Sequence, residues 1–293
     1  MKQAAHILMS RAVDYAGLFP PAGLSMDEAV RNYADYARTE HAWMLGRFIV
    51  PAARLQEFAK SLEANCCAER DLPWMLSLLA SKDAEADIAA MEQFVSGAAF
   101  VDALELRAES AVEAERLLAA YPRGISRFVE CPPAALPQIL PVLLRYGANA
   151  KIRTGGVTPE AIPGVETVAD FLLVCHAAGV ACKATAGLHH AMRGEYPLTY
   201  ETGAVRATMH GFLNLLAAML LVNTGAPKDA VVSALESIDP RDFRFTRVTF
   251  RWREYQFSRP QIEAARQQGL VSFGSCSFLE PVQTLADAMK EKV

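Results

Sequence analysis

The chain has 293 residues, of which 52% are hydrophobic and 21% are charged, and its formal net charge is −4. This length suits one large α/β barrel or two ordinary domains, and the apolar content is enough for a substantial core and excludes a disordered chain. The negative net charge argues against a general nucleic-acid binder.

The N-terminus, residues 1–9, is too weakly hydrophobic for a signal peptide. The longest apolar stretch, residues 211–222, falls well short of the ~20 residues that cross a bilayer, so we expect no membrane segment. We expect this stretch to be a helix that is either buried or forms a subunit interface of a homo-oligomer. The six cysteines include no C-x-x-C pair, and Cys66-Cys67 is a poor spacing for a disulfide or a zinc site. Reduced thiols in a cytoplasmic protein are therefore expected.

Short apolar segments alternate with helical patterns through the first two-thirds of the chain. The first helix begins with the capping box Ser25-x-x-Glu28, and the last of this series ends at Gly179. Several strands are almost wholly apolar, as buried parallel strands are. Seven such strand–helix units in series predict an eight-stranded (β/α)8 TIM barrel, with a doubly wound sheet as the alternative. The predicted strands cover about 14–19, 45–50, 74–79, 100–106, 125–130, 148–153 and 180–184, and the helices about 25–38, 53–66, 83–96, 110–120, 134–146 and 164–178.

Two segments compete for the eighth strand. Residues 243–250 alternate apolar and polar side chains, as in a half-exposed strand, whereas residues 269–273 precede a glycine turn and a helix from about Pro281. We favour the second segment. Residues 188–260 then form an insertion over the barrel mouth, with helices over about 203–223 and 227–236 and an aromatic, arginine-rich strand or hairpin. Because no linker or low-complexity tract interrupts the chain, residues 1–293 are predicted to form a single domain.

Two lysines, Lys151 and Lys183, lie late in consecutive predicted strands, each just before a glycine-containing turn. The carboxyl ends of parallel strands are where such folds place their chemistry. Arg153 shares the face of Lys151 by the period of two, which adds a third cation. Burial and neighbouring cations lower a lysine pKa, and a neutral amine is able to attack a carbonyl group. Alternatively, Lys151 and Arg153 pair with Glu105 and Glu130 in a buried ionic lattice.

Three segments carry a family resemblance: Lys151-x-x-Thr154-Gly155, Gly179-Val180-x-x-Lys183-Ala184-x-Ala186-Gly187 and Phe273-Gly274-Ser275-Cys276-Ser277-Phe278. Over about residues 150–190 and 269–290 the chain resembles the sixth, seventh and eighth strands of deoxyribose-phosphate aldolase and related class I aldolases. The resemblance implies that Lys151 forms a Schiff base, and that Lys183 tunes it and joins a proton relay.

An acid from the fourth strand would complete that relay. Asp102 and Glu105 are both available, and we favour Glu105 because it falls nearer the carboxyl end of the strand. Two departures from the family pattern leave the substrate open. Arg153 replaces a small residue, and the turn after the seventh strand reads Ala186-Gly187-Leu188-His189-His190.

Further polar groups follow predicted strand ends. Arg47 and Glu130, at strands two and five, are read either as substrate contacts or as rim salt bridges. His189 and His190 directly follow strand seven and are candidates for substrate contact or acid–base work. Adjacent residues rarely ligate one metal, so no metal is expected. Cys276 has no partner histidine that is evident from the sequence, and no nucleophilic role is assigned to it.

Glycine turns supply the remaining candidates. Gly155, Gly187, Gly274 and Ser275 are able to present backbone N–H groups to a phosphate or carboxylate, and barrels often bind phosphate beside strands seven and eight.

The sequence thus predicts a class I aldolase-like lyase that forms a lysine Schiff base with a small carbonyl substrate, phosphorylated or not. It predicts no cofactor and no nucleic-acid or membrane partner. Two alternatives stay open. One is a barrel enzyme that binds an anionic metabolite for isomerase or other proton-transfer chemistry without an imine. The other is a non-catalytic barrel whose cationic mouth holds an anion.

Overall fold

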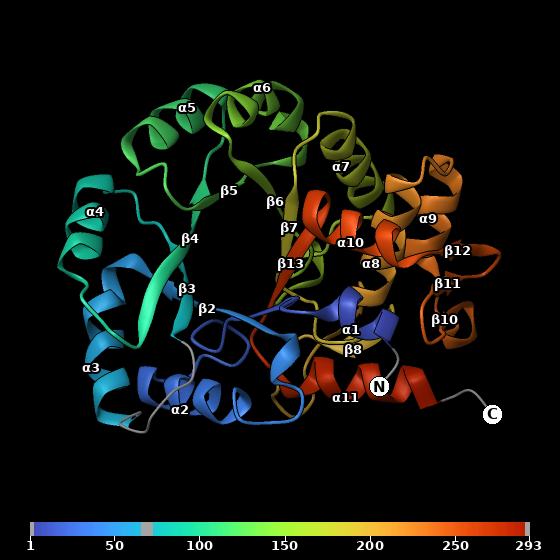
Figure 1. Cartoon of the computed structure of the whole chain (residues 1–293), viewed down its shortest axis with the longest axis horizontal. Coiled ribbons are helices and arrows are strands. Elements are labelled where there is room, and N and C mark those ends of the chain that lie inside the picture. Colours follow the sequence, from blue (N-terminus) through green and yellow to red (C-terminus); the bar gives the residue numbers. More distant parts are fainter. Residues whose placement is uncertain (1–2, 66–72, 291–293) are drawn as a thin grey trace.

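The structure is a computed structural model that describes residues 3–65 and 73–290 (Figure 1). The pair Cys66-Cys67, for which reduced thiols were expected, lies outside these residues.

Eight parallel strands close into a barrel in the order β1-β13-β7-β6-β5-β4-β3-β2. The predicted (β/α)8 barrel is confirmed, and the doubly wound sheet is wrong. The eighth strand is β13, which pairs with β7 and β1, so the second of the two candidate segments is the correct one. The barrel strands are β1 (Val13–Tyr15), β2 (Leu45–Pro51), β3 (Trp74–Leu79), β4 (Ala99–Arg107), β5 (Ser126–Glu130), β6 (Asn149–Arg153), β7 (Cys182–Thr185) and β13 (Leu270–Ser275).

Helices alternate with these strands and surround them (Figure 1). The capping box is present, since the Ser25 hydroxyl accepts from the Glu28 backbone N–H and the Glu28 side chain accepts from the Ser25 N–H. Short 3₁₀ turns lie at 42–44, 52–54, 133–135, 159–161 and 240–242. The helices outside the region between β7 and β13 are α1 (Gln3–Met9), α2 (Met26–Tyr36), α3 (Leu55–Asn65), α4 (Ala84–Gln93), α5 (Ala111–Ala120), α6 (Leu136–Tyr146), α7 (Val165–Ala177) and α11 (Leu279–Lys290).

The region between β7 and β13 contains both helices and small sheets. The helix expected over 203–223 is wrong in its first part, because residues 206–209 form a strand that pairs with residues 194–197. The aromatic segment expected as a strand or hairpin is a three-stranded antiparallel sheet. The elements are β8 (Gly194–Pro197), β9 (Arg206–Met209), α8 (Phe212–Asn223), α9 (Lys228–Glu236), β10 (Phe243–Phe245), β11 (Phe250–Trp252), β12 (Tyr255–Phe257) and α10 (Arg259–Gln268).

The helices and the three-stranded sheet of this region lie beside the barrel instead of over its mouth, whereas Tyr200, between β8 and β9, contacts Cys276 at the mouth. Helix α8 packs against α7, α9, α10 and β13, and Figure 1 shows α8, α9 and β10–β12 together on one side of the molecule. Every residue from Phe212 to Val222 is buried within the single chain. The apolar sequence of α8 is therefore explained by its place in the outer layer of the barrel, and the helix has no exposed face for the subunit interface considered above.

None of the helices in the described ranges is both long and apolar enough to cross a membrane.

Candidate active site

Inside the barrel, the carboxylate of Glu105 lies between the two lysines that the sequence predicted as site residues. Lys183 Nζ donates to Glu105 Oε1 at 2.7 Å, and Lys151 Nζ lies 2.8 Å from Glu105 Oε2. On its other side, Lys183 Nζ donates to Asp14 Oδ2 at 2.6 Å. The two lysines therefore point to the same interior of the barrel, as the sequence predicted, and Glu105 is the acid between them.

The series of ion pairs continues outward from Lys151. Its Nζ lies 2.8 Å from Glu130 Oε2, and Arg153 Nε donates to Glu130 Oε1 at 3.1 Å. Exposure rises along this series, since the Lys183 side chain is 0% exposed, that of Lys151 is 4% and that of Arg153 is 51%. The cluster thus runs from the closed interior to the barrel mouth.

Strand register explains why these side chains meet. Lys151 on β6 pairs with Lys183 on β7, and Glu130 on β5 pairs with Lys151. Parallel strands of a closed barrel place such positions in layers, so side chains from several strands meet at one level. Two buried hydroxyls also donate hydrogen bonds to these carboxylates. Ser77 donates to Glu105 Oε1 and Ser272 donates to Asp14 Oδ2, each at 2.7 Å.

The carboxylates shift the pKa of Lys151 in the direction opposite to the one that the sequence suggested. Burial lowers the pKa of Lys151, but Glu105 and Glu130 outweigh it and hold this pKa above its ordinary value. Burial raises the pKa of Glu105, but Lys151 and Lys183 outweigh it and hold this pKa well below the ordinary range. The expectation that neighbouring cations lower the pKa of Lys151 is wrong, because each ammonium lies between two carboxylates. The ionic-lattice interpretation describes the observed arrangement.

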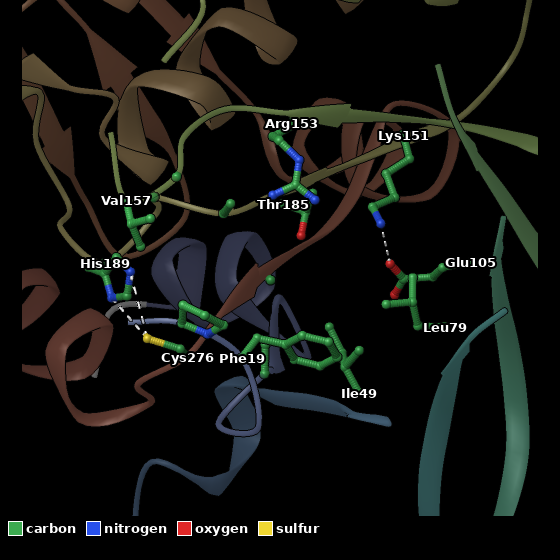
Figure 2. A pocket seen from close by; sticks show the side chains of 16 residues that line it. Phe19, Ile49, Leu79, Glu105, Lys151, Arg153, Val157, Thr185, His189 and Cys276 are labelled. Carbon is green, nitrogen blue, oxygen red and sulfur yellow. Dashed lines mark hydrogen bonds and ion pairs between the residues drawn. The ribbon is translucent and has the colours of Figure 1, made fainter. Parts of the chain in front are cut away.

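A cavity of about 320 Å³ opens at the carboxyl ends of the strands (Figure 2). Residues of the first strand–helix loop line it, including Ala16, Phe19 and Pro20. Lys183 does not line the cavity and lies behind Glu105, whereas Lys151 is at the cavity wall. Of the site residues predicted from the sequence, the lining contains Glu105, Lys151, Arg153, Gly187, His189 and Gly274.

Seven predicted site residues are absent from the lining: Lys183, Glu130, Gly155, Arg47, Asp102, Ser275 and His190. Arg47 is the third residue of β2 instead of its end, and it pairs with Asp102, so neither side chain lines the cavity. The Ser275 hydroxyl is buried without a hydrogen-bond partner in the described structure, and Ser275 is also absent from the lining. The His190 ring stacks on Tyr196 at 3.6 Å between centroids, and burial lowers the pKa of His190 to about 4.

Two glycines allow the turns after β6 and β7 to touch. A Cβ added to Gly155 would lie 2.9 Å from the Cα of Gly187, so only glycine fits this contact. Gly187 has a φ of +76°, and the preceding Ala186 has a φ of +65°, which is unusual for a residue with a side chain. Ala186 is held by its carbonyl, which accepts from the Thr154 hydroxyl at 2.8 Å. Gly155 therefore shapes the cavity from behind and is not part of its wall.

A second polar group lies in the same cavity, and the sequence did not reveal it. Cys276 Sγ is 3.9 Å from His189 Nε2, and His189 Nδ1 is 2.8 Å from Glu280 Oε2. The Tyr200 hydroxyl donates to the same Glu280 oxygen at 2.9 Å. Burial lowers the pKa of His189, but Cys276 and Glu280 outweigh it and raise this pKa to about 9. The missing partner histidine of Cys276 is thus His189, brought close because β7 and β13 are neighbours.

Within residues 3–65 and 73–290, no group of three or more His, Cys, Asp or Glu side chains is arranged to hold a metal ion.

The closed strand order and the charged cluster at its mouth define a (β/α)8 barrel protein with a candidate active site at the carboxyl ends of its strands. No family model and no curated protein matches the sequence. Among solved structures, the chain is similar to deoxyribose phosphate aldolase from Aeropyrum pernix, which is described as a unique tetramer. The two are 12% identical with a TM-score of 0.49, over 97% of this chain and 93% of that one. The strand order itself establishes the barrel.

Proposed function

We propose that this protein is a class I aldolase-like lyase in which Lys151 forms a Schiff base with a small carbonyl substrate. The observation that carries the proposal is the position of Lys151. Its amine lies at the wall of the cavity, whereas Lys183 lies behind Glu105 and does not reach the wall. Of the two lysines, only Lys151 is placed to meet a substrate within the described structure.

The amine must lose a proton before it attacks, because its raised pKa keeps it as an ammonium near neutral pH. Two carboxylates lie within 2.8 Å of it. Glu105 is shared with Lys183, which stabilises its ionised form and makes it the poorer acceptor. Glu130 does not line the main cavity but a separate recess of about 220 Å³, together with Arg107 and Cys131. We therefore assign proton transfer to Glu130, which is able to exchange its proton with water through this recess.

The chemistry then follows from the neutral amine. The Lys151 nitrogen adds to the carbonyl carbon, the carbonyl oxygen is protonated and leaves as water, and a protonated imine remains. That imine withdraws electrons from the adjacent carbon–carbon bond and permits its cleavage or formation. Lys183 and Ser77 both donate to Glu105 Oε1 and hold this carboxylate in place. Lys183 is thus a positioning residue.

Borohydride trapping tests the proposal. The protein is incubated with a panel of small aldehydes and ketones, reduced, and mapped by peptide mass spectrometry. We expect a reduced adduct on Lys151 and none on Lys183. The matched control is Lys151→Arg, which keeps a cation between Glu105 and Glu130 but cannot form an imine. If no carbonyl compound labels Lys151, or if labelling is the same in the control, the proposal fails.

One observation favours the alternative without an imine. The raised pKa of Lys151 suits an ammonium that polarises a substrate carbonyl while Glu130 removes a proton. Turnover of a carbonyl substrate that is unaffected by borohydride would support this second function. The third interpretation, a cationic mouth that holds an anion, has less support. The cations Lys183, Lys151, Arg153 and Arg47 all pair with carboxylates, which leaves little excess positive charge.

A further inference from the structure

The cavity contains a thiol, that of Cys276, besides the amine of Lys151. Figure 2 shows Cys276 and His189 at one side of the pocket, and Lys151 with Glu105 at the other. Cys276 and His189 both line the cavity, although each is less than a tenth exposed. A small molecule that enters the mouth would therefore meet a thiol as well as an amine.

The thiol has the neighbours that activate a nucleophile. Cys276 Sγ lies beside the His189 ring, 3.9 Å from Nε2 and 4.0 Å from Nδ1, and Glu280 lies 2.8 Å from Nδ1, so an acid orients the ring that contacts the sulfur. Tyr200 lies 3.7 Å from Cys276 Sγ and donates to Glu280, which fixes the acid in turn.

Fold topology explains how this set is assembled. Cys276 directly follows β13, His189 follows the turn after β7, and Glu280 lies in the first turn of α11. β7 and β13 are hydrogen-bonded neighbours, so their carboxyl ends open on the same side of the cavity. The set is independent of the lysine–carboxylate cluster, since none of the hydrogen bonds or ion pairs described above joins the two.

We propose that Cys276, with His189 and Glu280, is a second nucleophilic site that binds small aldehydes covalently. In the step, Cys276 Sγ bonds to the aldehyde carbon as the π bond of the carbonyl breaks. The thiol proton reaches the carbonyl oxygen through His189, and a thiohemiacetal results. No oxidant or reductant is required. This site does not depend on imine formation at Lys151.

Alkylation by iodoacetamide at pH 7, read cysteine by cysteine by mass spectrometry, tests the nucleophile. Cys131 is the internal control, because it is more exposed than Cys276 while burial and Glu130 raise its pKa to about 11. We expect Cys276 to react at least about ten-fold faster than Cys131. Equal or slower reaction of Cys276 in the unmodified chain would overturn the proposal, whatever the variants do.

Variants then test the partners of the thiol. His189→Gln is expected to slow alkylation of Cys276 at least about ten-fold, and Glu280→Gln is expected to slow it less. The matched control is His190→Gln, which removes a histidine one position away that stacks on Tyr196 outside the cavity. Circular dichroism verifies that each variant is folded. Unchanged reactivity in His189→Gln, or an equal loss in His190→Gln, contradicts the proposal.

Protection by propanal tests the aldehyde adduct. Propanal is expected to slow alkylation of Cys276 in both the unmodified protein and Lys151→Arg. Protection that disappears in Lys151→Arg would mean that an imine alone shields the thiol, which overturns adduct formation at Cys276. Because Lys151 is scored separately by borohydride trapping, failure at the thiol and failure at the amine are distinguishable.

Discussion

Lys151 and Lys183 bind opposite oxygens of a single carboxylate, that of Glu105. The shared acid cancels the repulsion that two neighbouring ammonium groups would otherwise suffer in a buried site. It also divides the lysines into one that reaches the cavity and one that holds the acid. The structure therefore gives the pair distinct positions, although the two residues occupy equivalent places on adjacent strands.

The first prediction concerns this shared carboxylate. Glu105→Gln keeps the shape of the side chain but removes the charge between two buried ammonium groups. Because breaking a buried ion pair leaves an uncompensated charge, we expect the free energy of unfolding to fall by about 3–5 kcal/mol, measured by urea titration. Glu57→Gln is the control, since Glu57 pairs with Arg54 at the surface, and its loss should cost less than about 1 kcal/mol. Similar values for the two variants would contradict a buried ionic cluster.

The sequence predicted the barrel well because its strands are strongly marked. The segment 74–79 was placed at its observed bounds, and 269–273 was correctly preferred as the eighth strand. The first strand, expected over 14–19, ends at Tyr15, and a larger boundary error lies before α8, which begins only at Phe212. Apolar residues around the whole of that helix give no helical face, so nothing in the pattern separated it from the strand at 206–209. The strand at 206–209 forms by pairing with residues 194–197, which is a tertiary contact that the local sequence pattern does not reveal.

The site was predictable where its residues lie on consecutive strands. Lys151, Lys183 and Glu105 follow from strand order and register. Asp14 was not found, because it is 169 residues from Lys183 and approaches it only when β1 closes the barrel against β13. The error in sign for the pKa of Lys151 has another cause, because the acids that raise it, Glu105 and Glu130, come from β4 and β5. The sequence motifs showed the neighbouring cations of Lys151, whereas the acids that neutralise these cations lie on other strands and were not included in the expected pKa.

The second prediction is a pH dependence that arises at His189. Its pKa is raised to about 9 in the folded protein, so its contribution to stability is fully present below about pH 6.5 and is lost as the pH rises towards 9. The difference in unfolding free energy between the unmodified protein and His189→Gln should shrink over this range by up to about 3 kcal/mol. Urea titrations at several pH values measure it.

His190 provides the control for this pH effect. Burial lowers the pKa of His190 to about 4, so its contribution is present above about pH 6.5 and is lost only as the pH falls towards 4. The difference between the unmodified protein and His190→Gln should therefore stay constant between pH 6.5 and 9. A constant difference for His189→Gln over the same range would refute the assignment of a raised pKa to His189.

The third prediction concerns the contact between the turns after β6 and β7. In Gly155→Ala the new methyl group would lie 2.9 Å from the Cα of Gly187, and backbone at that distance must move. We expect a loss of about 1–3 kcal/mol in unfolding free energy. The displaced turn should also lower borohydride labelling of Lys151. Gly124→Ala, where a Cβ meets nothing within 4 Å, should change neither measurement, and an equal effect there would show that the contact is unimportant.

The fourth prediction tests whether α8 is buried within its own chain or lies at a subunit interface. Leu220 is 0% exposed within the single chain, so Leu220→Ala should leave a cavity and lower the free energy of unfolding by about 2–5 kcal/mol. Val112→Ala, at a side chain that is 80% exposed, should change it by less than about 0.5 kcal/mol. Because α8 packs against α7, α9, α10 and β13 of its own chain, the molecular mass in solution should be the same for both variants and the unmodified protein. A change of mass on Leu220→Ala, measured by light scattering below the unfolding temperature, would instead place α8 at a subunit interface.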